Sequence, residues 1–208
     1  MTAIALSHVQ LSLRSSPFVP LALAFMGLGT GYLTFGPQEL LGYPRRTEEV
    51  DTGTGVWSIW MPGFMQVFAA FYLWTGLTLF GTFRTPTLYM AAFAFTAYGA
   101  HWFAMGWNRM RGTDTRINFG VAVAFTLTSI LGIIVFFGSG DNPIGGMFIG
   151  LTCTYVAELA ASLRPDLPRF GGLAERVLGF LHIAVGFFLM YLMFATVLDT
   201  TLRYSLPL

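Results

Sequence analysis

Long apolar runs separated by short polar intervals dominate the chain. A helix needs about 20 mostly apolar residues to cross a bilayer. Six segments meet this requirement, at about residues 17–36, 56–81, 86–107, 117–138, 143–162 and 174–198. The polar intervals are too short to form domains of their own, so residues 1–208 are predicted to form one membrane domain. The predicted fold is an all-α, six-transmembrane-helix bundle in which successive helices are antiparallel neighbours.

The polar intervals carry residues that are typical of connections. The longest, residues 37–55, is interpreted as the connection between the first two spans. Residues 138–143 read GSGDNP, a composition typical of a tight turn, and the RPDLPRF segment at 164–170 divides the last two spans.

The composition narrows the class of protein. Hydrophobic residues make up 55% of the chain and charged residues only 10%, whereas soluble domains carry about 25% charged residues. A net charge of +1 gives no reason to expect a nucleic-acid partner. With one cysteine, three histidines and no catalytic triad or zinc-protease motif, we expect no metal, no cofactor and no enzymatic activity.

The basic residues are unevenly distributed between the two sides of the predicted bundle. All eleven are arginines, and three of them, Arg14, Arg84 and Arg203, fall on the side of the chain ends. The other eight fall on the opposite side, namely Arg45, Arg46, Arg109, Arg111, Arg116, Arg164, Arg169 and Arg176. The positive-inside rule therefore predicts that both termini lie outside the cytoplasm.

Four ionisable residues fall within or at the ends of the predicted spans. His101 and His182 lie well inside their spans, where each either contacts a substrate or proton path or is hydrogen-bonded to a neighbouring helix. Glu158 and Asp199 lie near helix ends, so we expect their carboxylates to reach the headgroup layer.

Four sequence blocks resemble a known family when they are taken together and in order. They are GFMQVFAAF at 63–71, FTAYGAHW at 95–102, FFGSG at 136–140 and YLMFATVLD at 191–199. The chain resembles the acetate uptake transporter family, which consists of six-helix permeases for acetate and succinate. It departs from the family at its first-helix signature, NPAPLGL, of which only PLAL at 20–23 remains. It also has His101 where an aromatic residue is typical and His182 where glycine is typical.

The resemblance implies a homo-oligomer, a ring of six protomers, each with its own pore for a small carboxylate. Matched residue by residue, the implied constrictions are Met26, Tyr98 and Cys153. The implied polar contacts are Gln66, Thr96 and Thr154, and Trp102 lies in the same block as Tyr98. The family keeps its termini in the cytoplasm, which is opposite to the orientation that the arginines predict.

His101 follows Tyr98 by three residues and therefore shares its helix face. Our hypothesis is that His101 supplies a titratable donor that couples transport to pH. The sequence thus predicts a multi-pass protein of the cell (inner or plasma) membrane that passes small monocarboxylates such as acetate, or succinate, with coupling to protons. The alternative is a structural or accessory subunit of a larger complex that does not transport.

Overall fold

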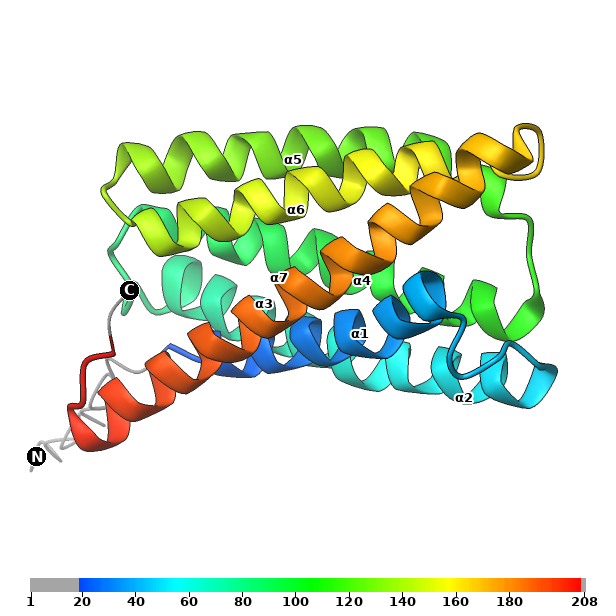
Figure 1. Cartoon of the computed structure of the whole chain (residues 1–208). Helices are drawn as coiled ribbons and strands as arrows, with labels where there is room; N and C mark the ends of the chain where they lie inside the picture. The colour runs from blue at the N-terminus through cyan, green and yellow to red at the C-terminus, as the bar shows by residue number, and fades with distance from the viewer. Residues whose placement is uncertain (1–18, 207–208) are drawn as a thin grey trace, which may run out of the picture.

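The computed structural model describes residues 19–206, and in them six long helical segments lie side by side as one bundle (Figure 1). They are α1 (Leu21–Leu41), a continuous second helix (Glu48–Leu79), α4 (Thr87–Arg111), α5 (Asn118–Gly138), α6 (Asn142–Ala161) and α7 (Pro168–Leu202). The second helix comprises α2 (Glu48–Ser58), a π-helical stretch (Ile59–Phe64), α3 (Met65–Trp74) and a second π-helical stretch (Thr75–Leu79). A short 3-10 turn, Thr115–Ile117, precedes α5.

The all-α fold that the hydropathy pattern predicts is therefore confirmed. Arg14 and residues 17–18 of the first predicted span lie outside the described residues.

Four of the helical segments are long and apolar enough to cross a membrane. They are Glu48–Leu79, Thr115–Gly138, Asn142–Ala161 and Pro168–Leu202. The helices α1 and α4 are long enough but less apolar, and both pack against neighbours within the bundle. Helix α1 packs along α7 and the second helix, whereas α4 packs along the second helix and α5. The chain is thus a multi-pass membrane protein whose less apolar helices pack inside the bundle.

The connection between the first two helices is shorter than the sequence predicts. Helix α1 continues to Leu41 and α2 begins at Glu48, so only residues 42–47 of the polar interval 37–55 connect them. Gly42 ends α1 in the left-handed conformation with φ of 69°, which costs glycine little. The Thr47 hydroxyl caps α2 by accepting a hydrogen bond from the Val50 N–H at 3.3 Å.

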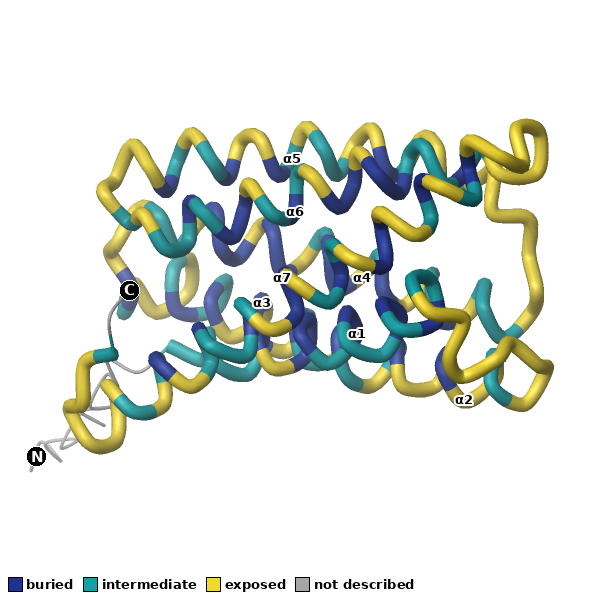
Figure 2. The backbone as a smooth tube through the Cα atoms, in the orientation of Figure 1, coloured by how far each residue is buried: buried dark blue, intermediate teal, exposed yellow. Residues whose placement is uncertain are grey.

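The centre of the bundle is aromatic. Helix α7 crosses diagonally along α1, and α5 lies beside α6 (Figure 1). Buried positions gather on the inward faces of the helices, and the outward faces are largely exposed (Figure 2). The largest buried side chains at the centre include Tyr32, Phe35, Tyr98, Trp102 and Tyr155. The exposed outward faces are rich in Phe, Leu and Val, as expected where lipid rather than water is the solvent.

The connections divide between the two ends of the bundle. Residues 42–47, 112–114 and 162–167 lie at one end, on the right in Figure 1. Residues 80–86 and 139–141 lie at the other end, together with both ends of the described chain. The first end is the Arg-rich side of the sequence, and the cavity described next opens there.

Candidate functional site

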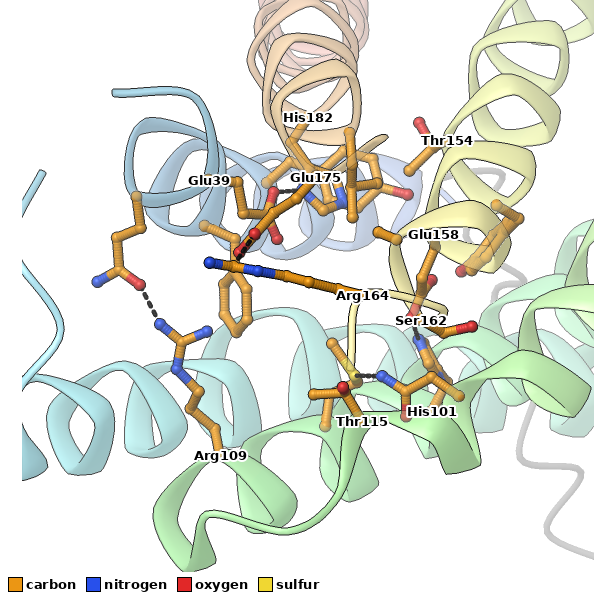
Figure 3. A pocket seen from close by; sticks show the side chains of 18 of the residues that line it. Glu39, His101, Arg109, Thr115, Thr154, Glu158, Ser162, Arg164, Glu175 and His182 are labelled. Carbon is orange, nitrogen blue, oxygen red and sulfur yellow. Dashed lines mark hydrogen bonds and ion pairs between the residues drawn. The ribbon is translucent and has the colours of Figure 1, made fainter. Parts of the chain in front are cut away.

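A cavity of about 530 Å³ opens at the Arg-rich end of the bundle, and we call it the vestibule. Side chains from α1, α4, α6 and α7 form its walls, and the connections at this end contribute to its mouth (Figure 3). The polar groups that define it are Glu39, His101, Arg109, Thr154, Glu158, Arg164, Glu175 and His182. In a bundle built mainly from apolar side chains, this concentration of ionisable groups makes the vestibule the candidate functional site.

Two pairs of histidine and glutamate face the vestibule. His182 Nδ1 of α7 lies 2.6 Å from Glu39 Oε2 of α1, which is a hydrogen bond between two largely buried side chains. His101 Nε2 of α4 lies 3.9 Å from Glu158 Oε1 of α6, which is within the range of an ion pair but too long for a hydrogen bond. His182 and Glu39 are therefore directly hydrogen-bonded, whereas His101 and Glu158 face each other across a distance longer than a hydrogen bond.

The arginines at the mouth are paired with acidic side chains. Arg109 Nε donates to Asp51 Oδ1 at 2.7 Å, and the same guanidinium hydrogen-bonds to Gln38. Arg164 pairs with Glu175 across the connection between α6 and α7. Arg46 also pairs with Asp51, so two guanidinium groups share that one carboxylate.

Two connections at the mouth are joined by a small network of charges. Arg116 lies 3.5 Å from Asp166, linking the start of α5 to the connection after α6. Hydrogen bonds from the Arg116 guanidinium and backbone lower the pKa of Asp114 to about 2. Asp114 therefore keeps its negative charge over the whole physiological range of pH.

A layer of aromatic rings separates the vestibule from a second cavity. Tyr155 lines the vestibule and stacks on Tyr98 with ring centroids 5.6 Å apart. Tyr98 lines the second, smaller cavity of about 70 Å³, which is mainly apolar and reaches Thr87 and Asp141 at the opposite end. The Tyr98 hydroxyl is fixed by a 2.9 Å hydrogen bond with Ser129. The two cavities thus approach each other from opposite ends of the bundle and stop at this pair of rings.

Half of the residues that the sequence nominated gather at this junction. Thr154, His101 and Trp102 line the vestibule, and Tyr98 lies directly behind Tyr155. Gln66 of α3 is fully buried but does not line either cavity. Neither polar atom of its side-chain amide has a hydrogen-bond partner among the described residues.

The other three nominated residues lie on the outside of the bundle. Met26 and Cys153 are exposed, and so is Thr96, whose hydroxyl accepts a 2.9 Å hydrogen bond from Trp74 Nε1. The implied roles of Met26 and Cys153 as constrictions and of Thr96 as a polar contact do not match these positions. For Cys153 the cause is its rotation about the helix axis. It precedes the buried Thr154 by one residue, which turns its side chain by about 100° away from that of Thr154.

Sequence reasoning did not nominate Glu39 or Glu175 of the vestibule, and it expected a different position for Glu158. Glu39 falls in the interval interpreted as a connection, but it is part of α1. Glu158, which we expected to reach the headgroup layer, is buried and faces His101. The available signal was its spacing, since Glu158 follows the inward-facing Thr154 by four residues and shares its helix face. Asp199 is exposed near the end of α7, as its position in the sequence indicates.

The vestibule does not have the ligand arrangement of a metal centre. Among residues 19–206, no group of three or more histidine, cysteine, aspartate or glutamate side chains is placed to hold a metal ion.

The fold, rather than the sequence, relates this chain to a known protein. No family model and no curated protein sequence matches it. Its fold is similar to that in the solved structure of the bacterial acetate channel SatP, with a TM-score of 0.68 and 18% sequence identity. The similarity covers 93% of this chain and 99% of the channel. The chain therefore has an acetate-channel-like fold.

Proposed function

We propose that this protein is a transporter or channel for small monocarboxylates such as acetate. In this proposal all six helices cross the cell membrane, and the substrate passes through the chain between the vestibule and the second cavity. The observation that carries the proposal is the pair of cavities that approach from opposite ends and meet at the stacked rings of Tyr98 and Tyr155. The likeness of the fold to an acetate channel supports it.

The chemistry of the two cavities suits a small weak acid. The vestibule offers hydroxyl and imidazole groups that replace part of the water around a carboxyl group, including Thr154 and His101. The second cavity is lined mainly by Leu, Phe and Ala side chains, which accept the short apolar end of the molecule. A sugar or a metal ion would lose its hydration in that cavity without compensation.

The direct test is uptake of labelled acetate by liposomes that contain the purified protein, with a pH gradient across the membrane. We expect uptake well above that of empty vesicles, and succinate measured in parallel defines how large a substrate is accepted. No acetate uptake by a protein whose helical circular dichroism and elution volume indicate a folded bundle would contradict the proposal. That result would favour the accessory-subunit alternative, as would partner proteins that co-purify in stoichiometric amounts. A homo-oligomeric particle of six chains in mild detergent would support the implied assembly.

His101 provides a test of coupling between transport and pH. Its ring faces Glu158 across a gap in the vestibule wall, so a change in the charge of either group alters the field that a carboxyl group meets. In a His101→Phe variant we expect the pH profile of acetate uptake between pH 5 and pH 8 to change, because phenylalanine fills the space but cannot titrate. A profile that superimposes on that of the unmodified protein would remove His101 from the coupling.

A further inference from the structure

An apolar groove of about 450 Å³ runs between α6 and α7 on the outside of the bundle. It shares no lining residue with the vestibule, so the two cavities use different faces of these helices. The short side chains of Ala157, Ala160 and Ala174 leave the space between the helices unfilled. The groove is open to the lipid-facing side, because the bordering Phe170 and Val177 side chains are about half exposed.

The groove has the length and the lining that suit one hydrocarbon chain. Helix α6 is about 30 Å long, which equals the thickness of the hydrocarbon core of a bilayer. On α6 the lining runs from Thr152, at the middle of the helix, to Ala160 near its end, so the groove spans about one leaflet. The Thr152 hydroxyl donates to the Phe148 carbonyl oxygen at 2.8 Å and needs no partner from a ligand.

Two arginines border the groove on α7. Arg169 and Arg176 are exposed and share one helix face with Leu173, which lines the groove. Neither guanidinium makes a hydrogen bond or an ion pair with another described residue, whereas the nearby Arg164 and Glu175 pair with each other. Because an arginine that faces lipid is costly without a counter-ion, these two positive charges indicate a negatively charged partner.

The places of the two arginines match a headgroup above a chain in the groove. Arg169 lies in the first turn of α7, at the outer end of the groove beside Phe170. Arg176 lies two turns deeper, and helical side chains lean toward the N-terminus of their helix, so its side chain extends back toward Arg169. A guanidinium binds a phosphate group through two parallel hydrogen bonds. A phosphate held by the two arginines would therefore lie at the outer end of the groove, where an acyl chain can enter.

We propose that this groove binds an anionic phospholipid, with one acyl chain in the groove and the headgroup phosphate on Arg169 and Arg176. A headgroup with net negative charge is favoured over a zwitterionic one, because the two guanidinium groups have no carboxylate partner to neutralise them. A second copy of the chain packed on the same face would bring like charges together. The lipid site goes beyond the proposed transport of carboxylates and is separate from its path.

The test is native mass spectrometry of the detergent-purified protein, titrated with phosphatidylglycerol or with phosphatidylcholine of the same acyl chains. We expect the unmodified protein to bind phosphatidylglycerol more tightly. In the double variant Arg169→Gln with Arg176→Gln, phosphatidylglycerol should bind about 30-fold more weakly, as for the loss of two arginine contacts. The matched control, Arg45→Gln with Arg111→Gln, removes two exposed arginines from the same end of the bundle but outside α6 and α7. Its affinity for phosphatidylglycerol should equal that of the unmodified protein.

A second variant, Ala160→Phe, tests the place of the acyl chain. Ala160 lines the groove and is partly exposed, so the phenylalanine ring can occupy the groove while every charge is retained. We expect phosphatidylglycerol to bind about tenfold more weakly, as when two methylene groups lose their contact with the protein. The midpoint of unfolding without added lipid should not fall.

Several results would overturn the proposal. They are equal affinity for the two lipids, unchanged affinity for phosphatidylglycerol in the arginine double variant or in Ala160→Phe, and an equal loss in the arginine control. A particle of several chains that dissociates in Ala160→Phe, while phosphatidylglycerol binding stays the same, would assign the groove to a second copy instead. None of these measurements involves acetate, so a protein that transports nothing could still have the lipid site.

Discussion

Replacing Arg109 with methionine is expected to destabilise the protein by about 3 kcal/mol, between the values for exposed and buried ion pairs. Arg109 joins α4 to α2 through its 2.7 Å ion pair with Asp51, and to α1 through Gln38. Its guanidinium also lies 5.0 Å above the centre of the Phe35 ring. Methionine retains the apolar stem but leaves the buried Gln38 oxygen without a donor. The expected result is a lower midpoint of unfolding when the protein in mixed micelles is titrated with sodium dodecyl sulfate.

The matched control is Arg111→Met, two residues further along the same helix. Arg111 is exposed, and its guanidinium lies 4.7 Å above the ring of Trp107 rather than in the network with Asp51. Its replacement should cost no more than about 1 kcal/mol, as for an exposed cation–π contact. If both variants lost the same unfolding free energy, Arg109 would stabilise the protein through its positive charge alone and not through its contacts with Asp51 and Gln38.

Replacing Gly179 with alanine is expected to force α1 and α7 apart and to destabilise the protein by about 2 kcal/mol, as overpacking does. A Cβ atom at Gly179 would lie 2.5 Å from the Leu40 backbone nitrogen and 2.8 Å from the Gly36 carbonyl oxygen. Backbone atoms cannot rotate out of the way, so the helices must shift. Because Glu39 and His182 flank this contact, we expect acetate uptake to fall as well.

Gly172→Ala is the control on the same helix. A Cβ atom there meets no other atom within 4 Å, and alanine favours the helix over glycine by up to about 1 kcal/mol. This variant should therefore be as stable as the unmodified protein or more stable. If Gly179→Ala were equally stable, the close approach of α1 and α7 would not be a feature of the protein in its membrane or micelle.

The hydropathy pattern predicts most of the fold. Where the structure differs from that prediction, the cause lies in the local sequence. Runs of apolar residues locate the helical segments because a bilayer leaves the backbone no other way to satisfy its hydrogen bonds. The interval 37–55 is mostly helical in spite of its polarity. Its Thr-Glu-Glu sequence at 47–49 is a recognisable helix start that hydropathy alone does not register.

The candidate site was harder to predict, because the position of a residue within a helical segment does not determine whether its side chain faces the inside of the bundle or its outer surface. The resemblance implied that Tyr98 and Thr154 line a pore, and the spacing of three residues put His101 on the same helix face as Tyr98. In the structure Tyr98 lines the smaller cavity, and His101 and Thr154 line the vestibule. The resemblance also placed Met26 and Cys153 in a pore, whereas both are exposed on the outer surface. Glu158 has no counterpart in the quoted motifs, and the structure adds its contact with His101 to the spacing that puts it on the face of Thr154.

The central claim, that substrate passes through the vestibule, has a direct and reversible test. Ala161 lines the vestibule wall at the end of α6, and Cys153 is the single cysteine of the chain. In a Cys153→Ser background, Ala161→Cys places one thiol in the vestibule. That thiol is labelled with a negatively charged methanethiosulfonate before the protein is reconstituted into liposomes.

We predict that labelling abolishes acetate uptake and that a reducing agent restores it, because the attached group fills the vestibule and repels anions. The Cys153→Ser protein treated in the same way should keep its uptake. Undiminished uptake by protein that mass spectrometry shows to be fully labelled at position 161 would contradict the account, since the substrate would then have to cross by another route.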